Sequence, residues 1–240
     1  MCGACFQGGS AGRVRGPDRV RALLVFVKDP VPGRVKTRLC PPLSPVQAAL
    51  LYGAMMRDSV DRFSRIEGVR VLLMAEPPLG GLASSPPGGH PLLEQRGEDL
   101  GGRLTDAFGR AFASGFTAVA AVGSDHPTLP LSHIQTAFRL LESGSPCVLG
   151  PAEDGGYCLV GLSRPLPEIF RGIDWSTARV LDQTEARLSG LGLRAGRLDP
   201  WYDVDTVQDL RRLRADLAAP LEGLSRTREA LRSLPGGQEP

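Results

Sequence analysis

Short apolar runs alternate with longer amphipathic stretches along most of the chain. The run at 22–27 (ALLVFV) is continuous and rich in Leu and Val, as expected for a strand that is buried on both faces. Between 45 and 63, apolar side chains recur at steps of three to five, and Ser44-Pro45 provides an N-cap and a first-turn proline. This alternation of strand and helix patterns predicts an α/β domain with a largely parallel sheet.

The same pattern, interrupted by Gly and Pro, locates the other elements. The run at 157–161 follows the run at 147–150 closely enough to be its antiparallel partner, and 76–90 contains Pro-Pro and Gly-Gly pairs that predict a surface loop. The predicted strands are 22–27, 69–75, 92–95, 118–123, 147–150, 157–161 and 193–198, and the predicted helices are 45–63, 100–113, 132–142, 176–188 and 206–217.

The length of 240 residues fits one domain. We expect this domain at 21–233, after a flexible tail at 1–20 and before a tail at 234–240. No apolar run approaches the roughly 18 residues that span a bilayer, and residues 1–20 lack the apolar segment of a secretory signal. The sequence therefore predicts a protein with no membrane association. Five cysteines are an odd number, which favours a reduced, cytoplasmic location over a disulfide framework.

The formal net charge of +2 lies in the first part of the chain, because residues 1–21 carry +3 and the remainder is nearly neutral. A nearly neutral body offers no field for nucleic acid, so we expect no such partner. Of the 28 basic residues only two are lysines, Lys28 and Lys36, and both lie in one loop. Ammonium groups act as point charges on phosphates, whereas guanidinium groups are planar forks.

That loop, 28–38, follows the first predicted strand and carries four cations. In open α/β sheets ligands bind at the carboxyl ends of the strands, and cations with backbone N–H groups form a phosphate cradle there. The loop lacks the G-x-x-x-x-G-K-[ST] pattern of a P-loop, but its prolines and glycine fix its shape. The predicted phosphate-binding residues are Lys28, Pro32, Gly33, Arg34, Lys36, Thr37 and Arg38.

A second polar segment, Gly123-Ser124-Asp125, ends the strand at 118–123. A carboxylate that emerges from an apolar strand beside a phosphate site suits a hard divalent ion, and the alternative is that Asp125 caps a turn. His126 has no second His or Cys at ligand spacing, so we expect it to be packed or solvent-facing rather than a metal ligand.

Two later segments carry further carboxylates. Asp154 precedes two glycines, which predicts either a hairpin turn or a loop that wraps an acceptor. Asp203 and Asp205 alternate with Val204, so in an extended segment both carboxylates point to the same side. Asp205 is a candidate second metal ligand, and the alternative is that Asp205-Thr206 caps the last predicted helix.

Six segments, in order, resemble one protein family. The chain is similar to the nucleotide-diphospho-sugar transferase (GT-A) superfamily, and more narrowly to bacterial radical-SAM/selenodomain-associated glycosyltransferase-like proteins. The resemblance covers about residues 22–215. The matching segments are FVKDPVPGRVKTRL at 26–39, QRGEDLGGRLTDAF at 95–108, GSDHPTL at 123–129, LGPAEDGGYCLVGL at 149–162, GIDWST at 172–177 and WYDVDTVQDL at 201–210.

The resemblance implies a single-domain, Rossmann-like GT-A fold with a mostly parallel mixed sheet flanked by helices. It implies that the 28–38 loop, with Gly123 and Ser124, covers nucleotide phosphates and that Asp125 holds Mg²⁺ or Mn²⁺. Phospholactate guanylyltransferase and molybdenum-cofactor guanylyltransferase share this layout. The residues that we expect on the acceptor side are Gly155, Gly156, Tyr157, Trp175, Ser176 and Thr177.

The expected activity is metal-dependent nucleotidyl transfer from a nucleoside triphosphate to a small phosphorylated acceptor, with Lys36, Asp125 and Asp154 as the candidate catalytic residues. The alternatives are a glycosyltransferase that uses a nucleotide-sugar donor, with Asp154 as base, and a non-catalytic nucleotide-binding module. Four cations in one loop suit a triphosphate better than a diphosphate. The sequence names neither base nor acceptor, and a homodimer is one state that it allows.

Overall fold

A seven-stranded sheet forms the centre of the protein, whose computed structural model describes residues 20–234. The strand order is β3-β2-β1-β4-β6-β5-β7. The strands are β1 (Arg21–Val27), β2 (Val69–Ala75), β3 (Leu92–Glu94), β4 (Ala118–Gly123), β5 (Cys147–Pro151), β6 (Tyr157–Leu162) and β7 (Ala195–Arg197).

Six of the seven strands run in the same direction. The pairs β1/β2, β1/β4, β2/β3 and β5/β7 are parallel, whereas β6 is antiparallel to both β4 and β5. The carboxyl ends of these six strands therefore meet at one edge, and β1 lies where the strand order reverses. Such a reversal leaves a crevice between the loops that leave β1 and β4. The predicted α/β class with a mostly parallel mixed sheet is confirmed.

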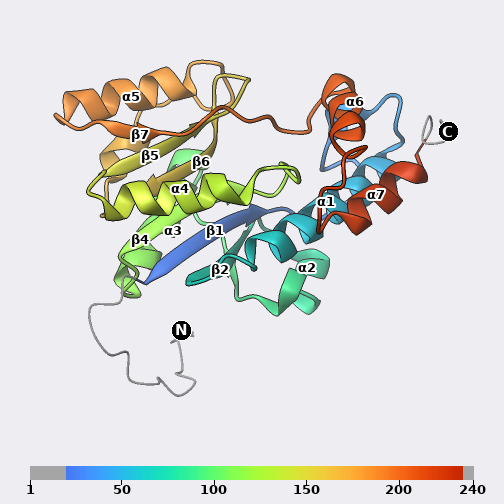
Figure 1. Cartoon of the computed structure of the whole chain (residues 1–240), viewed down its shortest axis with the longest axis horizontal. Helices are drawn as coiled ribbons and strands as arrows, with labels where there is room; N and C mark the ends of the chain where they lie inside the picture. The colour runs from blue at the N-terminus through green and yellow to red at the C-terminus, as the bar shows by residue number, and fades with distance from the viewer. Residues whose placement is uncertain (1–19, 235–240) are drawn as a thin grey trace.

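Helices cover both faces of the sheet. Alternate residues of β1 point to opposite faces, so Leu23 and Val25 join one buried cluster and Ala22 and Leu24 join the other. In Figure 1 the β1 arrow points toward the end of the molecule where α1, α6 and α7 gather. The helices are α1 (Pro45–Phe63), α2 (Gly80–Ser84), α3 (Leu100–Ala113), α4 (Leu131–Glu142), α5 (Val180–Gly190), α6 (Val207–Asp216) and α7 (Ser225–Arg232).

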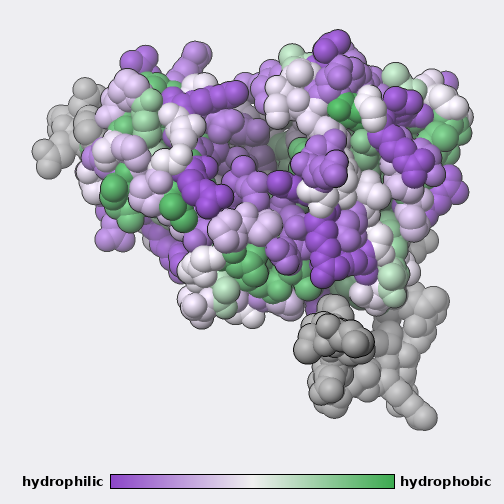
Figure 2. All heavy atoms as spheres, turned by 180° about the vertical axis from the view of Figure 1, so that it is seen from behind, coloured by the Kyte–Doolittle hydropathy of each residue, from purple (hydrophilic) through white to green (hydrophobic). Residues whose placement is uncertain are grey.

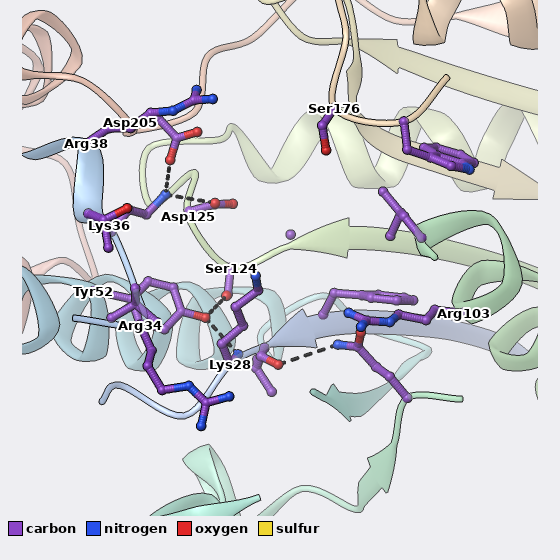
Figure 3. Close-up of a pocket in the computed structure, with 18 of the residues that line it drawn as sticks. Lys28, Arg34, Lys36, Arg38, Tyr52, Arg103, Ser124, Asp125, Ser176 and Asp205 are labelled. Carbon is purple, nitrogen blue, oxygen red and sulfur yellow. Dashed lines mark hydrogen bonds and ion pairs between the residues drawn. The ribbon is translucent and has the colours of Figure 1, made fainter. Parts of the chain in front are cut away.

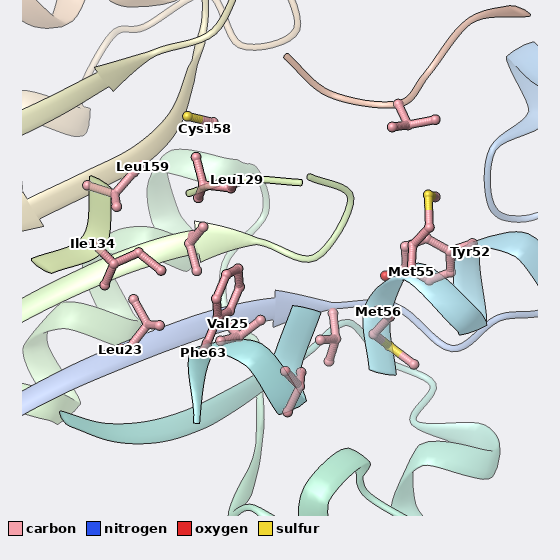
Figure 4. Packing of buried hydrophobic residues seen from close by; sticks show 14 of the residues in the cluster. Leu23, Val25, Tyr52, Met55, Met56, Phe63, Leu129, Ile134, Cys158 and Leu159 are labelled. Atoms are coloured by element: carbon pink, nitrogen blue, oxygen red, sulfur yellow. The ribbon is translucent and has the colours of Figure 1, made fainter. Parts of the chain in front are cut away.

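The larger buried cluster lies on one face of the sheet and includes residues of α1, α4, α6 and α7 (Figure 4). Phe63 and Met55 of α1 and Ile134 of α4 are fully buried there. The second cluster packs α3 and α5 against the other face, where Phe108 stacks on Phe170 with ring centroids 5.8 Å apart. Two apolar layers on one sheet hold the loops at the carboxyl edge in fixed positions.

Helix α1 begins with the cap that its sequence predicts. The Ser44 hydroxyl accepts a hydrogen bond from Gln47 N at 3.3 Å, and Ser44 N donates to Gln47 Oε1 at 2.8 Å, which is a capping box. The apolar face of α1 carries Tyr52 into the carboxyl edge of the sheet. This cap therefore sets the direction from which one helix approaches the site.

Some elements differ from those predicted. The segment 76–90 contains the short helix α2, and α5 begins at Val180 rather than at 176, because the residues before Val180 form turns around Ser176. Helix α7 was not predicted, since its sequence is strongly polar and only its packing on α1 holds it. The predicted tails lie outside the described residues except for Val20 and Leu234. Within residues 20–234, no helix combines the length and the apolar character needed to cross a membrane.

A buried carboxylate on α1 attaches α7. The Asp58 side chain is 1% exposed, and its Oδ2 accepts hydrogen bonds from Thr227 N at 2.7 Å and Thr227 Oγ1 at 2.8 Å. We expect Asp58→Ala to lower the free energy of unfolding by about 2–4 kcal/mol, because it leaves these buried donors unpaired. Urea unfolding measures this loss, and hydrogen exchange of residues 225–232 locates it. The matched control is Asp61→Ala, whose exposed ion pair with Arg226 should contribute less than about 1 kcal/mol. Equal losses in the two variants would contradict this assignment.

Candidate active site

A polar cavity lies at the reversal point of the sheet, between the loops that leave β1 and β4. Its volume is about 620 Å³, and it is lined by the 28–38 loop, by Ser124 and Asp125, and by Trp175 and Ser176 on the opposite wall. On the face seen in Figure 2 the surface is hollowed near its upper middle, and hydrophilic residues surround the hollow. The sequence-predicted loops thus meet around one polar cavity.

The basic loop has a rigid local structure. Arg34 N donates to Val31 O at 3.0 Å, and Gly33 has φ 79°, so Val31–Arg34 is a turn with proline and then glycine at its centre, as in a type II turn. Val35 and Leu39 are buried in the large apolar cluster. The loop is therefore anchored at two points, and its polar side chains project from a fixed backbone.

Lys36 lies at the centre of an ion-pair network. Its Nζ donates to Asp125 Oδ2 at 2.8 Å and to Asp205 Oδ1 at 2.7 Å, and its side chain is only 4% exposed (Figure 3). Its backbone has φ 49° and ψ 39°, a left-handed conformation that is uncommon for lysine. Strain of this kind is retained where the surrounding contacts fix a residue, and it occurs often at functional sites.

The charged forms of Lys36 and Asp125 are both stabilised in this network. Burial alone would lower the pKa of Lys36, but the charges of Asp125 and Asp205 outweigh burial and raise it. Burial alone would raise the pKa of Asp125, but Lys36 and His126 outweigh burial and hold it well below its usual range. Lys36 is therefore an ammonium and Asp125 a carboxylate at neutral pH.

A hydroxyl pair forms the floor of the cavity. The Tyr52 hydroxyl accepts a hydrogen bond from Lys28 N at 2.9 Å and shares one with Ser124 Oγ at 2.9 Å. Burial raises the pKa of Tyr52 to about 12, so the phenol stays protonated. This chain of bonds joins the backbone after β1 to the segment after β4 and fixes the width of the crevice.

A second ion pair lies at the end of the cavity near β2 and β3. Glu76 Oε1 lies 2.7 Å from Arg103 NH1, and Glu76 Oε2 lies 3.1 Å from Lys28 Nζ. Burial would raise the pKa of Glu76, but Arg103 and Lys28 outweigh burial and lower it. The Lys28 ammonium is thus paired with a carboxylate, although its side chain remains 57% exposed.

The two arginines of the loop differ from its lysines. Arg34 and Arg38 both line the cavity and are exposed. Within the described part of the chain, neither guanidinium group has a hydrogen bond or an ion pair. In Figure 3 both extend beyond the ion-pair network. Of the four predicted phosphate-binding cations, these two are therefore available without breaking an internal contact.

Asp125 also belongs to a cluster with His126 and Asp203. His126 is 3% exposed, and its Nδ1 lies 2.7 Å from Asp203 Oδ1 while its Nε2 lies 3.5 Å from Asp125 Oδ1. One ligand atom from each of the three residues falls within 4.8 Å of the others, so this cluster fits a divalent metal ion. Val204 N donates to Asp125 O at 3.1 Å, which brings the 203–205 segment next to Asp125.

The two aspartates of the 203–205 segment have different partners. The expected metal pair was Asp125 and Asp205. In the structure Asp205 contacts Lys36, and Asp203 contacts His126. Thr206, not Asp205, is the N-cap of α6, since its hydroxyl accepts from Asp209 N. His126 is packed, as predicted, yet it lies within the acidic cluster.

The loop that carries Asp154 does not line the main cavity. Asp154 is exposed, and its Oδ1 accepts a hydrogen bond from Gly156 N at 2.9 Å, which is the turn alternative that the sequence left open. Gly155 has φ 89°, and a Cβ there would lie 2.3 Å from Ala178 O, so the loop packs on the start of α5. Asp154 and both glycines are absent from the lining of the cavities described in this section.

Three of the residues expected to bind the acceptor, Trp175, Ser176 and Tyr157, line the main cavity or the one next to it. Trp175 and Ser176 line the main cavity, and Ser176 has φ 63°, a second uncommon backbone conformation in the site. Tyr157 contacts Trp175 edge-on at 6.3 Å and lines an adjoining cavity of about 170 Å³. Thr177 instead donates to Asp174 O at 2.7 Å and stabilises the turn before α5.

Sequence reasoning missed several residues of the site. Tyr52 was hidden on the apolar face of its helix, where an aromatic residue predicts core. Glu76 and Arg103 meet only because β2 and α3 meet at the same edge. The segment QRGEDLGGRL at 95–104 was the available signal, since it contains Arg103 and the buried Gln95, which also lines the cavity.

Comparison with known proteins places the chain in a family. A family model described as "Uncharacterized protein conserved in bacteria (DUF2064)" matches residues 59–177. A comparison with curated protein sequences gives no match. Among solved structures, a candidate nucleotide-diphospho-sugar transferase from Desulfovibrio desulfuricans G20 is 32% identical, with 87% of this chain and 94% of that chain covered and a TM-score of 0.80. The chain belongs to the family of this protein, within the nucleotide-diphospho-sugar transferase superfamily.

More distant structures share the fold. A cytidylyltransferase from Leptospira borgpetersenii serovar Hardjo-bovis is 13% identical, with 89% of this chain and 94% of that chain covered and a TM-score of 0.55. CMP:2-keto-3-deoxy-manno-octonic acid synthetase, solved in complex with CTP, is 12% identical, with 84% and 99% covered and a TM-score of 0.56. These two structures show the fold alone, and the 32% identical relative confirms the expected superfamily.

Proposed function

We propose that the protein is a nucleotidyltransferase that transfers a nucleoside monophosphate from a nucleoside triphosphate to a small phosphorylated acceptor. The observation that carries this proposal is the main cavity, whose lining combines the ammonium–carboxylate pair of Lys36 and Asp125 with two guanidinium groups that have no partner among residues 20–234. The similarity to a candidate nucleotide-diphospho-sugar transferase, and the fold shared with a cytidylyltransferase, support it.

The basic loop supplies the triphosphate contacts. Arg34 and Arg38 have planar donor forks that suit terminal phosphates, and binding a phosphate costs them no internal partner. Lys36 has three N–H donors and uses two on carboxylates, which leaves one for a phosphate oxygen. A triphosphate brings more negative charge to these three cations than the diphosphate of a nucleotide sugar does.

A divalent cation fits the carboxylates next to this loop. Asp125 is ionised and lines the cavity, and Asp203 and His126 lie beside it. When bound, Mg²⁺ or Mn²⁺ would neutralise charge on the phosphates and orient them for attack. Lys36 holds the Asp125 carboxylate in place through its second oxygen, so this lysine positions the cation site as well as contacting substrate.

The chemical step follows from these positions. An oxygen of the acceptor phosphate attacks the α-phosphorus, the bond from that phosphorus to the bridging oxygen breaks, and pyrophosphate leaves. Arg34, Arg38 and Lys36 stabilise the charge that develops on the leaving pyrophosphate. An acceptor phosphate is already anionic and needs no general base, so the step does not require Asp154, which forms a turn outside the cavity.

The acceptor has a place on the opposite wall. In Figure 3, Ser176 lies across the cavity from Ser124 and Lys28. Trp175 and Tyr157 connect this wall to the adjoining cavity, which has a largely apolar lining with Tyr157 among its polar groups. A small acceptor on this side approaches the α-phosphate from the face opposite the basic loop.

Glycosyl transfer is the second candidate. The observation that favours it is that the 32% identical relative is described as a candidate nucleotide-diphospho-sugar transferase. In that reaction the same cations would stabilise a departing nucleoside diphosphate. The two reactions differ in the donor that binds and in the product that leaves.

Melting temperature and product analysis distinguish the two reactions. We expect one of ATP, CTP, GTP and UTP, with Mg²⁺ or Mn²⁺, to raise the Tm more than UDP-glucose or GDP-mannose does, because bound ligand stabilises the native state. The preferred triphosphate should then release pyrophosphate when glycerol phosphate, lactate phosphate or hexose phosphates are supplied. Stronger stabilisation by a nucleotide sugar, with release of nucleoside diphosphate, would establish glycosyl transfer instead. No stabilisation by either class would exclude both reactions.

A further inference from the structure

The two oxygens of the Asp125 carboxylate face different groups. Oδ2 accepts the hydrogen bond from Lys36, whereas Oδ1 lies 3.5 Å from His126 Nε2. In Figure 3 one oxygen of Asp125 meets the dashed line to Lys36 and the other is turned away from it. Lys36 also engages Asp205, so the side of Asp125 that remains open to a cation is the side of His126 and not that of Asp205.

The imidazole of His126 is buried, with a side chain that is 3% exposed, and makes no hydrogen bond to a described residue. Its Nδ1 nevertheless lies only 2.7 Å from Asp203 Oδ1. A carboxylate beside one ring nitrogen is the arrangement that orients histidines as metal ligands, and the other nitrogen, Nε2, is turned toward Asp125 Oδ1.

The backbone makes room for this pair of atoms. A Cβ on Gly123 would lie 2.6 Å from His126 Nε2 and 2.7 Å from Asp125 Oδ1. Only glycine therefore permits both atoms to approach each other at the end of β4. Two ligands that bind one metal ion at about 2.1 Å lie about 3.0–3.4 Å apart at angles between 90° and 110°. The observed separation of 3.5 Å is close to this range.

We propose that Asp125 Oδ1 and His126 Nε2 bind a divalent transition-metal ion, that Asp203 orients the imidazole, and that the site prefers Mn²⁺ to Mg²⁺. The preference follows from the donor set, because imidazole nitrogen suits transition metals whereas Mg²⁺ requires oxygen ligands. The role of this ion in catalysis rests on the proposed function. Binding of the ion does not, since its ligands all belong to this chain.

The position of the site connects it to both cavities. Asp125 and Gly123 line the main cavity and also the adjoining one, which His126 and Asp203 line as well. An ion between Oδ1 and Nε2 would therefore lie at the junction of the proposed nucleotide and acceptor sides, with coordination positions open to phosphate oxygens from each.

Mn²⁺ binding to the full chain without nucleotide tests the proposal. Electron paramagnetic resonance of free Mn²⁺ gives the affinity, competition with Mg²⁺ gives the preference, and electron spin echo envelope modulation detects a ¹⁴N nucleus bound to Mn²⁺. We expect a ¹⁴N coupling in the unaltered protein, and His126→Gln should abolish it and reduce the preference for Mn²⁺ about tenfold or more. Asp203→Asn should weaken Mn²⁺ binding about 10–100-fold, as the loss of an orienting carboxylate does elsewhere.

The matched control is His133→Gln, since the His133 ring contacts Asp199 O and Trp201 away from this cluster. It should change neither the coupling nor the affinity. Absence of a ¹⁴N coupling in the unaltered protein, or equal binding of Mn²⁺ and Mg²⁺, would overturn the proposal without requiring any variant to fold. If Mn²⁺ binds as expected but no nucleotide raises the Tm, the proposed function fails and the metal site stands.

Discussion

Lys36→Met is expected to weaken triphosphate binding by at least about 100-fold. The variant removes a charge-assisted hydrogen bond to phosphate, which contributes about 1.5–3 kcal/mol, and each factor of ten in affinity corresponds to about 1.4 kcal/mol. It also leaves Asp125 and Asp205 as neighbouring carboxylates without the ammonium that both contact, so their repulsion displaces the segments after β4 and β7. Calorimetry with the preferred triphosphate measures the loss.

Lys36→Arg separates the charge of this residue from its shape. The Lys36 side chain is 4% exposed between two carboxylates, so a wider planar fork cannot occupy the same position. We expect this variant to bind triphosphate about 10–100-fold more weakly than the unaltered protein at fixed ionic strength. Arg70→Met removes an exposed cation from β2, away from the cavity, and should change nothing measurable. If Lys36→Arg binds as the unaltered protein does, the phosphate contact lies elsewhere in the loop.

The double variant Arg34→Gln/Arg38→Gln is expected to lower triphosphate affinity by about 100-fold to 10,000-fold. Each guanidinium group contributes a charge-assisted contact of about 1.5–3 kcal/mol, and the two act on the same terminal phosphates. Since neither side chain has an internal partner in the described residues, the variant should unfold at the same urea concentration as the unaltered protein.

Two control measurements test whether these arginines contact the terminal phosphates. The affinity for the corresponding nucleoside monophosphate should change far less, because it lacks the phosphates that these arginines contact. Arg171→Gln/Arg194→Gln removes the same net charge from exposed positions outside the cavity and should have only a small effect that added salt abolishes. Equal losses for the triphosphate and the monophosphate would place the arginines away from the terminal phosphates.

The sequence predicts the fold well because the relevant signals are local. Continuous apolar runs such as 22–27 define the buried parallel strands, and Ser44-Pro45 marks the start of α1. The alternation of Asp203 and Asp205 predicts carboxylates on the same side of an extended segment, and in the structure each contacts a residue of the candidate site, His126 and Lys36. These predictions depend on periodicity and capping over a few residues.

Which carboxylate meets which partner depends on contacts between distant segments. The sequence does not show that Lys36 lies between Asp125 and Asp205, because its partners are 89 and 169 residues away. It also does not distinguish Tyr52 at the cavity from the apolar side chains around it, since all share one helix face. Helix α7 has few apolar residues, and its docking depends on the buried carboxylate of Asp58.

The Lys36 network has a consequence for how the protein is made. Its three members come from the loops after β1, β4 and β7, so a nascent chain that has not yet exposed Asp205 outside the ribosome lacks the complete network. Domains fold as units and long-range contacts form late, so we expect the Lys36 network to be complete only after nearly the whole domain has been translated. Until then Lys36 and Asp125 lack the carboxylate of Asp205, and we expect the partly synthesised chain not to bind triphosphate.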